Sequence, residues 1–351
     1  MKILAVMENL ADVKAFSGGR YHAWLVCRAM QTIGHDVTVM THRVPVWLPD
    51  LPGKRTGVKM VRPTLSAKTC FIEPSEEFDL VITFPIRATA WGVDLAEANG
   101  LPVWSWVFDP FLFIERYAPG VCKRMAFDEG YTIGLQRSTK IVSSVSCVND
   151  VITEWTGNGN VVELPPCINS KVADKVSVRR TKNVKIVAIT RNVAHKGPRM
   201  LFGAFKALRE LIPEAQLVVF SGFSTGGLEQ LARQVGVKGV RFMSKTTEQV
   251  KWKELKSATA LLSGSLYEGF GLWLAEAIYA MTPFVVFNFP IFWELARGLG
   301  GYFADYGDRD ALTQALIDCV LADHDELRMQ LSAIAPMYGF PAFCDRVEGL
   351  F

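Results

Sequence analysis

The chain has 351 residues, half of them apolar, so it can bury large cores and is expected to form two domains. Its net charge of +3, with 21% charged residues, is too small to indicate a nucleic-acid partner. Because its seven cysteines lack C-x-x-C spacing and no Cys/His pattern is typical of zinc, the sequence predicts a cytoplasmic protein with reduced thiols.

Strand-like apolar runs alternate with helical patterns along the whole chain. In the first half we expect strands at residues 3–7, 36–40, 80–83, 103–107, 140–143 and 161–164, and a helix at 21–33. In the second half we expect strands at 184–189, 216–220, 240–242, 258–262, 284–286 and 302–304. Helices are expected there at 199–211, 228–235, 247–257, 272–280, 309–321 and 325–334. This alternation predicts parallel sheets with crossover helices.

Two cations stand in the loop that follows the strand at 184–189. They are Arg191 and Lys196, and Gly197 comes next. An α/β sheet presents its ligands at the carboxyl ends of its strands. A diphosphate suits this pair, since Arg makes bidentate contacts and Lys is a point charge. Either cation alone would more simply be solvated.

A second loop leads from the strand at 258–262 into a helix and carries two carboxylates. It reads Glu268-Gly269-Phe270-Gly271-Leu272, and Glu276 follows in the helix. Free N–H groups at a helix start can bind a phosphate or a sugar hydroxyl, and glutamates accept hydrogen bonds from polyols. The alternative is an ordinary connection with a solvated glutamate. Together with the first loop, the pattern indicates a nucleotide sugar as ligand.

Two Asp-x-Asp sequences near the end of the chain could be mistaken for metal sites. They are Asp308-Arg309-Asp310 and Asp323-His324-Asp325. Each stands at the start of a predicted helix, where an aspartate usually caps the free N–H groups. We therefore expect no metal.

Contact with a membrane surface is an alternative to a fully cytoplasmic protein. No apolar stretch is long enough to span a bilayer. Residues 170–185 hold six cations against Asp174 alone, which favours either a solvated linker or an anionic surface. An apolar loop at 44–52, followed by Lys54 and Arg55, either folds onto its own domain or contacts an acceptor or a membrane.

These motifs resemble those of the retaining GT-B glycosyltransferases, specifically glycosyltransferase family 4. That family has an R-x-x-x-x-K-G loop, matched by Arg191, Lys196 and Gly197, and a Glu-x₇-Glu motif, matched by Glu268 and Glu276. Residues 213–222 are similar to the family's P-x-A-x-L-x-x-x-G strand. The amino-terminal half matches more loosely, through a Gly18-Gly19 loop before a helix.

The resemblance implies an α/β protein of the GT-B fold. Two Rossmann-like domains with parallel sheets would face each other across a cleft, and a C-terminal helix would cross back to the first domain. We expect an acceptor-side domain at 1–168, a donor domain at 169–335 and the returning helix at 336–351.

The resemblance also implies roles for single residues. The donor would be bound by Gly18, Gly19, Arg191, Lys196, Glu268, Gly269, Phe270, Gly271, Leu272 and Glu276, with Glu276 on the ribose hydroxyls. The candidate catalytic residues would be Glu268, Asp109, Arg191 and Lys196. One departure concerns Phe108, which stands where the family commonly has a histidine, although Asp109 is retained.

The function implied is transfer of a hexose, with retention and without a metal or other cofactor. A UDP or GDP sugar would be the donor substrate. The acceptor stays open among polysaccharide, lipid, protein, small metabolite and modified nucleic-acid base, and so does the oligomeric state. The alternatives are a nucleotide-sugar epimerase or phosphorylase of the same fold, or a non-catalytic nucleotide-sugar binding protein.

Overall fold

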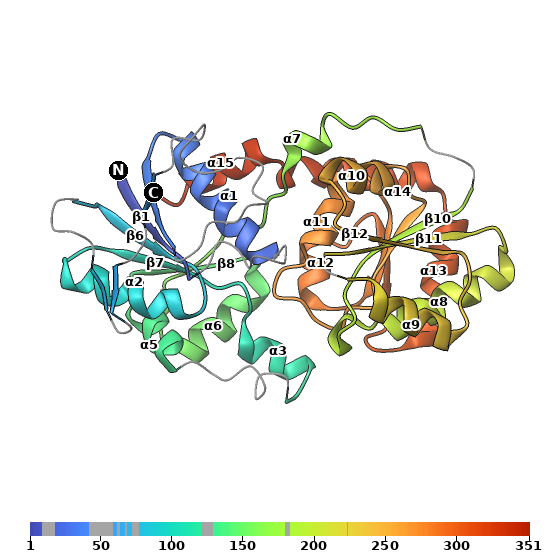
Figure 1. The fold of residues 1–351 in the computed structure, drawn as a ribbon, viewed down its shortest axis with the longest axis horizontal. Coiled ribbons are helices and arrows are strands. Elements are labelled where there is room, and N and C mark those ends of the chain that lie inside the picture. Colours follow the sequence, from blue (N-terminus) through green and yellow to red (C-terminus); the bar gives the residue numbers. More distant parts are fainter. Residues whose placement is uncertain are drawn as a thin grey trace. The chain divides into compact units, whose positions relative to one another are not determined.

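The computed structural model in Figure 1 describes residues 1–8, 18–41, 59–61, 64–66, 69–71, 77–120, 129–179, 183–222 and 224–351. It consists of two compact units, one of Met1–Pro166 with Pro341–Phe351 and one of Cys167–Phe340. Each unit has its own parallel sheet, so the predicted α/β class is confirmed. The loop at 44–52 and the cations Lys54 and Arg55 lie outside the described residues.

The first unit is built on a sheet of seven strands in the order β3-β2-β1-β6-β7-β8-β9. The strands are β1 Lys2–Val6, β2 Asp36–Met40, β3 Lys59–Val61, β6 Leu80–Thr83, β7 Val103–Trp106, β8 Lys140–Ser143 and β9 Val161–Glu163. All neighbours are parallel. The central strands are apolar along their length because helices cover both faces of the sheet. Strands β4 (Thr64–Ser66) and β5 (Thr69–Phe71) form a separate antiparallel pair.

Figure 1 shows α1 and α15 on one face of this sheet and α2 and α5 on the other. The helices of the unit are α1 Gly18–Thr32, α2 Arg87–Ala98, α3 Phe111–Tyr117, α5 Glu129–Arg137, α6 Asn149–Thr156, α15 Phe340–Glu348 and the 3-10 helix η1 Ser146–Val148. The structure starts α1 at Gly18, three residues before the predicted start. The two glycines therefore form the first turn of the helix instead of the loop we expected.

The last helix, α15, returns to the first unit. Phe343 is fully buried there and meets the His22 ring edge-on at 5.5 Å. Arg346 Nη2 donates to the carbonyl of Pro165 at 3.4 Å, and Lys140 Nζ donates to that of Leu350 at 2.6 Å.

The second unit extends further along the chain than the expected boundary at residue 335. The 3-10 helix η3, Ala335–Tyr338, stays with it because Tyr338 is fully buried and donates its hydroxyl to the carbonyl of Leu295. The backbone N–H of Ile168 donates to the carbonyl of Tyr338 at 3.0 Å. The division therefore falls after Phe340.

The sheet of the second unit has six strands in the order β12-β11-β10-β13-β14-β15. They are β10 Lys185–Ile189, β11 Gln216–Ser221, β12 Val240–Ser244, β13 Ala260–Leu262, β14 Phe284–Phe287 and β15 Gly301–Ala304. The helices are α7 Ser170–Ala173, η2 Ala194–Lys196, α8 Pro198–Leu211, α9 Gly226–Val235, α10 Glu248–Lys256, α11 Leu272–Tyr279, α12 Pro290–Ala296, α13 Arg309–Leu321 and α14 His324–Ile334. In Figure 1, α8, α9 and α13 cover one face and α10 and α14 the other.

The order of these strands reverses between β10 and β13. From β10 the chain builds outward through β11 and β12, whereas from β13 it builds the other way through β14 and β15. The two central strands pair in parallel, with Ile186 opposite Ala260. Open α/β sheets bind ligands at such a switch point, outside the carboxyl ends of the strands. The loops predicted from sequence follow these two strands.

Candidate functional site

The loops after β10 and β13 touch through their backbones. Gly197 has φ +50°, and a methyl group on it would overlap the carbonyl oxygen of Gly264. A methyl group on Gly264 would in turn lie 2.5 Å from the carbonyl oxygen of Gly197. The N–H of Leu266 donates to the carbonyl of His195 at 2.8 Å. Glycine is required at both positions because the backbones of the two loops approach too closely for a side chain.

This contact places Lys196 beside Glu268. The two side chains form an ion pair, and each is only 11% exposed. Trp273 Nε1 donates to the same carboxylate oxygen at 2.9 Å. Burial raises the pKa of Glu268, but the charge of Lys196 and the hydrogen bonds from Lys196, Trp273 and Ser265 outweigh it and hold the pKa below its usual value. Glu268 is therefore a fixed, ionised carboxylate.

Glu276 lies in a second ion-pair cluster, between α10 and α11. Lys251 Nζ lies 2.6 Å from Glu276 Oε1 and 2.9 Å from Glu248 Oε2. Glu276 is 14% and Lys251 11% exposed, whereas Glu248 is 37% exposed. Burial, together with the like charge of Glu248, raises the pKa of Glu276, while Lys251 opposes the shift. Burial lowers the pKa of Lys251, but the two carboxylates outweigh it and raise that pKa.

The turn between the two glutamates leaves backbone donors at the start of α11. Gly271 is the N-cap with φ +69°, a left-handed conformation that favours glycine, and it makes no side-chain cap. The first N–H groups of a helix have no acceptor inside the helix. Phe270 is buried below the turn with 8% exposure. The residues from Gly269 to Leu272 thus offer amides at the carboxyl edge of the sheet, at the switch point.

Two further side chains of the first loop differ in environment. Arg191 is exposed at its start. His195 stacks on Tyr267, with ring centroids 4.6 Å apart. Burial and the charge of Lys196 lower the pKa of His195 to about 4, with Glu268 opposing and Arg191 adding to the shift. His195 is therefore a neutral imidazole at pH 7.

The remaining predicted residues belong to the first unit. Gly18 and Gly19 stand in the first turn of α1, and a methyl group on Gly19 would lie 3.1 Å from the ring of Phe108. Gly19 thus makes room for the ring of Phe108. Asp109 follows β7 and is exposed. The burial of Tyr131 raises the pKa of that tyrosine, and the charge of Asp109 adds to the shift.

The first aspartate of each Asp-x-Asp sequence caps a helix, as predicted. Asp308 accepts from the N–H groups of Asp310 and Ala311 at 2.7 and 3.0 Å. Asp323 accepts from those of Asp325 and Glu326 at 2.9 and 3.3 Å. Within the described ranges, no three His, Cys, Asp or Glu side chains gather closely enough to hold a metal ion.

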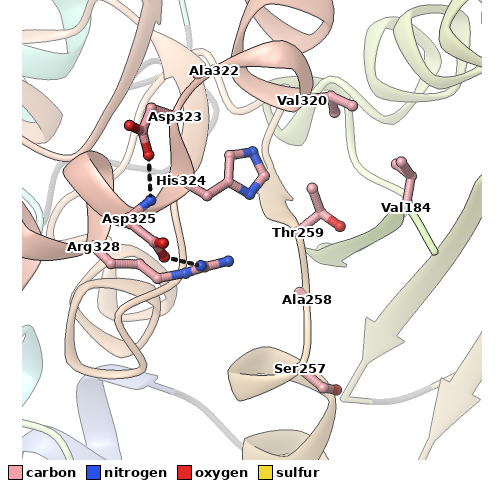
Figure 2. Close-up of a pocket in the computed structure, with 10 residues that line it drawn as sticks. All are labelled: Val184, Ser257, Ala258, Thr259, Val320, Ala322, Asp323, His324, Asp325 and Arg328. Atoms are coloured by element: carbon pink, nitrogen blue, oxygen red, sulfur yellow. Dashed lines mark hydrogen bonds and ion pairs between the residues drawn. The ribbon is translucent and has the colours of Figure 1, made fainter. Parts of the chain in front are cut away.

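A pocket of about 420 Å³ lies at the other, amino edge of the same sheet (Figure 2). Its lining includes Val184 and Thr259, which directly precede β10 and β13. Asp323 is occupied as a cap, and Asp325 pairs with Arg328 at 3.0 Å. Two carboxylates against one guanidinium make this lining unsuitable for a diphosphate. The pocket therefore does not compete with the switch point as a donor site.

The sequence did not reveal Lys251 or Trp273 as parts of the site. Lys251 stands 25 residues before the carboxylate that it pairs with, and its nearest sequence pattern is a helical pair with Glu248. Trp273 reads as an apolar helix residue, although its Nε1 binds Glu268. Among the described residues, no helix is both long and apolar enough to cross a membrane.

Solved structures share the fold over the whole chain. Sucrose-phosphate synthase from Thermosynechococcus elongatus is 17% identical with a TM-score of 0.80, covering 100% of this chain and 98% of its own. HepE from Anabaena, in complex with UDP-glucose, is 14% identical with a TM-score of 0.76, covering 100% and 99%. WaaG, a glycosyltransferase involved in lipopolysaccharide biosynthesis, is 15% identical with a TM-score of 0.69, covering 99% and 100%. The chain has the GT-B fold, with two Rossmann-like domains.

The second unit also matches a family model. Residues 169–336, which make up most of this unit, match the model described as Glycosyl transferases group 1. The match includes both loops at the switch point. No curated protein matches the chain in sequence.

Proposed function

We propose that the protein is a retaining glycosyltransferase that moves a hexose from a UDP or GDP sugar to an acceptor hydroxyl, without a metal. The observation that carries the proposal is the joining of the two loops at the switch point of the second unit. They bring Lys196, Glu268 and the amides from Gly269 to Leu272 to one edge of the sheet. The UDP-glucose complex of HepE supports a nucleotide sugar as donor.

Each group has a role in this reaction. Arg191, Lys196 and the first amides of α11 would bind the diphosphate, and Glu276 the ribose hydroxyls. Lys196 carries three donors, so it can keep its bond to Glu268 while it binds a phosphate oxygen. Glu268, held by Trp273, would accept hydrogen bonds from the hexose.

The chemical step breaks the bond between the anomeric carbon and the β-phosphate oxygen. The nucleoside diphosphate leaves with the electron pair, and the acceptor oxygen bonds to that carbon from the same face. The acceptor's proton passes to the leaving phosphate oxygen, and Asp109 would orient the acceptor hydroxyl or the hexose. Prearranged donors stabilise the growing phosphate charge, and removal of one typically costs about 2.7–4 kcal/mol in the barrier.

Release of the nucleoside diphosphate tests the proposal. The protein is incubated with UDP-glucose, UDP-galactose, GDP-mannose and related donors, with and without EDTA, and free UDP or GDP is measured. We expect release from at least one donor, by transfer or slow hydrolysis, that persists in EDTA and disappears in Lys196→Ala. Release that requires inorganic phosphate would indicate a phosphorylase instead. Absence of both release and nucleotide-induced thermal stabilisation would contradict the proposal.

A further inference from the structure

The cluster of Lys251, Glu248 and Glu276 joins two helices at the second glutamate of the site. Lys251 and Glu248 stand one turn apart on α10, and Glu276 stands on α11. The ammonium bonds Glu276 Oε1 at 2.6 Å, whereas Glu276 Oε2 has no hydrogen-bond partner within the described ranges. One oxygen of the carboxylate is thus fixed and the other is left for a ligand.

We propose that Lys251 is a positioning residue, held by Glu248, that fixes the carboxylate of Glu276 for the ribose hydroxyls of a nucleoside diphosphate. The inference rests on the proposed function for the identity of that ligand. Lys251 itself bonds Glu276 and needs no contact with the donor.

The physical reason is the isolation of Glu276. It is mostly buried, and the only charged groups that face it in the described part of the chain are Lys251 and Glu248, both from α10. A buried carboxyl beside a like charge favours its protonated form. A protonated carboxyl is a poorer acceptor for two hydroxyls than a carboxylate is. Lys251 supplies the opposite charge, which opposes this rise in the pKa of Glu276 and favours the carboxylate.

Glu248 has two opposing effects in this cluster. Its bond to Lys251 at 2.9 Å limits the positions that the ammonium can take. Its negative charge also raises the pKa of Glu276. Because Glu248 is 37% exposed, its replacement is far less disruptive than that of the buried lysine.

The test compares UDP with 2′,3′-dideoxy-UDP, which lacks both ribose hydroxyls. Affinities are measured by calorimetry from pH 5.5 to 9 in the wild-type protein, Lys251→Met, Lys251→Arg and Glu276→Gln. The ratio of the two affinities cancels the titration of the shared diphosphate and any inactive fraction of a variant. If GDP is the nucleotide that binds, the guanine pair of ligands is used.

We expect the wild-type protein to prefer UDP by about tenfold or more, the value of a hydrogen bond to a charged group. In Lys251→Met, the ratio of the affinity for UDP to that for the dideoxy analogue should fall toward one at pH 6.5. The preference should recover as the pH rises, because the ionised fraction of Glu276 grows by about tenfold per pH unit below its pKa. Lys251→Arg should retain most of the preference, and Glu276→Gln should lose it at every pH.

Glu248→Gln supplies a test of opposite sign that does not depend on the folding of Lys251→Met. Removal of the like charge lowers the pKa of Glu276, so the preference for UDP should persist to lower pH than in the wild-type protein. An unchanged profile in both Lys251→Met and Glu248→Gln would overturn the inference. If Lys251→Met does not fold, an unchanged profile in Glu248→Gln alone overturns it.

The outcomes distinguish the proposed function from the proposed role of Lys251. Failure of the wild-type protein to bind UDP or GDP would contradict the proposed function. Binding that depends on Glu276 but not on Lys251 would contradict the further inference alone.

Discussion

Lys196 and Glu268 are 72 residues apart in the sequence and form an ion pair that links the loops after β10 and β13. Each side chain is 11% exposed, so neither charge is well solvated without the other. The pair therefore contributes to the stability of the second unit as well as to the proposed donor site.

Removal of one partner should lower the free energy of unfolding by an amount that depends on pH. Lys196→Met leaves the buried carboxylate of Glu268 uncompensated, which typically destabilises a protein by about 3–5 kcal/mol at pH 7. In the wild-type protein the pKa of Glu268 is held low, so its contribution is present above the unfolded-state pKa and is lost as the pH falls. Without Lys196 burial dominates, and the deficit should shrink as the pH falls from 7 to 5.

Urea unfolding of both proteins across that range measures the difference. Lys206→Met is a matched control, because Lys206 is exposed and its ammonium, among the described residues, bonds only the backbone carbonyl of Val235. A loss of unfolding free energy in Lys196→Met that is constant with pH, or equal to that in Lys206→Met, would contradict a buried, compensated charge on Glu268.

The hydrogen bond from Trp273 to Glu268 should matter more for turnover than for folding. Trp273→Phe keeps the aromatic contact with Phe292, whose ring centroid is 5.3 Å away, and removes only the indole N–H. Hydrogen bonds to charged groups are worth about 1.5–3 kcal/mol. We expect donor turnover to fall by about tenfold or more while the melting temperature changes by a few degrees. Equal turnover in the two proteins would show that the bond does not orient Glu268.

The contact between Gly197 and Gly264 should not tolerate a side chain. Gly264→Ala places a methyl group 2.5 Å from the backbone carbonyl of Gly197, and neither group can move without shifting a loop. Such overpacking typically costs about 1–3 kcal/mol. Gly226→Ala is the matched control in the same unit, since its nearest contact would be Ser224 Oγ at 3.8 Å. Chemical denaturation of the two variants should show a loss of stability for Gly264→Ala alone.

The neutral state of His195 should appear in the acid stability of the protein. Its pKa is about 4 in the folded state against 6.5 when unperturbed, so the unfolded chain binds the extra proton first as the pH falls. The folded state therefore loses stability progressively from about pH 6.5 to pH 4. His195→Gln removes this titration, and its free energy of unfolding should fall less steeply over that interval. Parallel curves for the wild-type protein and the variant, measured in urea, would exclude the assigned environment.

The sequence predicted the strands of both sheets except β3, and the two site loops, because these depend on local patterns. An apolar run such as Val103–Trp106 is buried on both faces wherever it lies in the sheet. The spacing of Arg191, Lys196 and Glu268 after their strands placed them at the carboxyl edge. Their donor-binding roles, and that of Asp109, stay predictions.

Other features depend on contacts between distant segments and had no local signal. Glu276 was predicted as a ribose ligand, but nothing near it in sequence indicated that Lys251 would be bonded to it. Gly19, in the first turn of α1, lies against Phe108, which follows the distant strand β7. Such pairings follow from the packed fold and are not encoded in spacing.

The chain passes between its two units twice, after Pro166 and after Phe340. Near these two crossings, within the second unit, the N–H of Ile168 donates to the carbonyl of Tyr338 at 3.0 Å. The second unit is one continuous segment, but the first unit is not, so no single truncation yields the first unit intact. A fragment ending at Pro166 would lack the helix that covers His22, and would be expected to aggregate through the apolar surface thus uncovered. A separately expressed amino-terminal half needs residues 341–351 grafted back or added as a peptide.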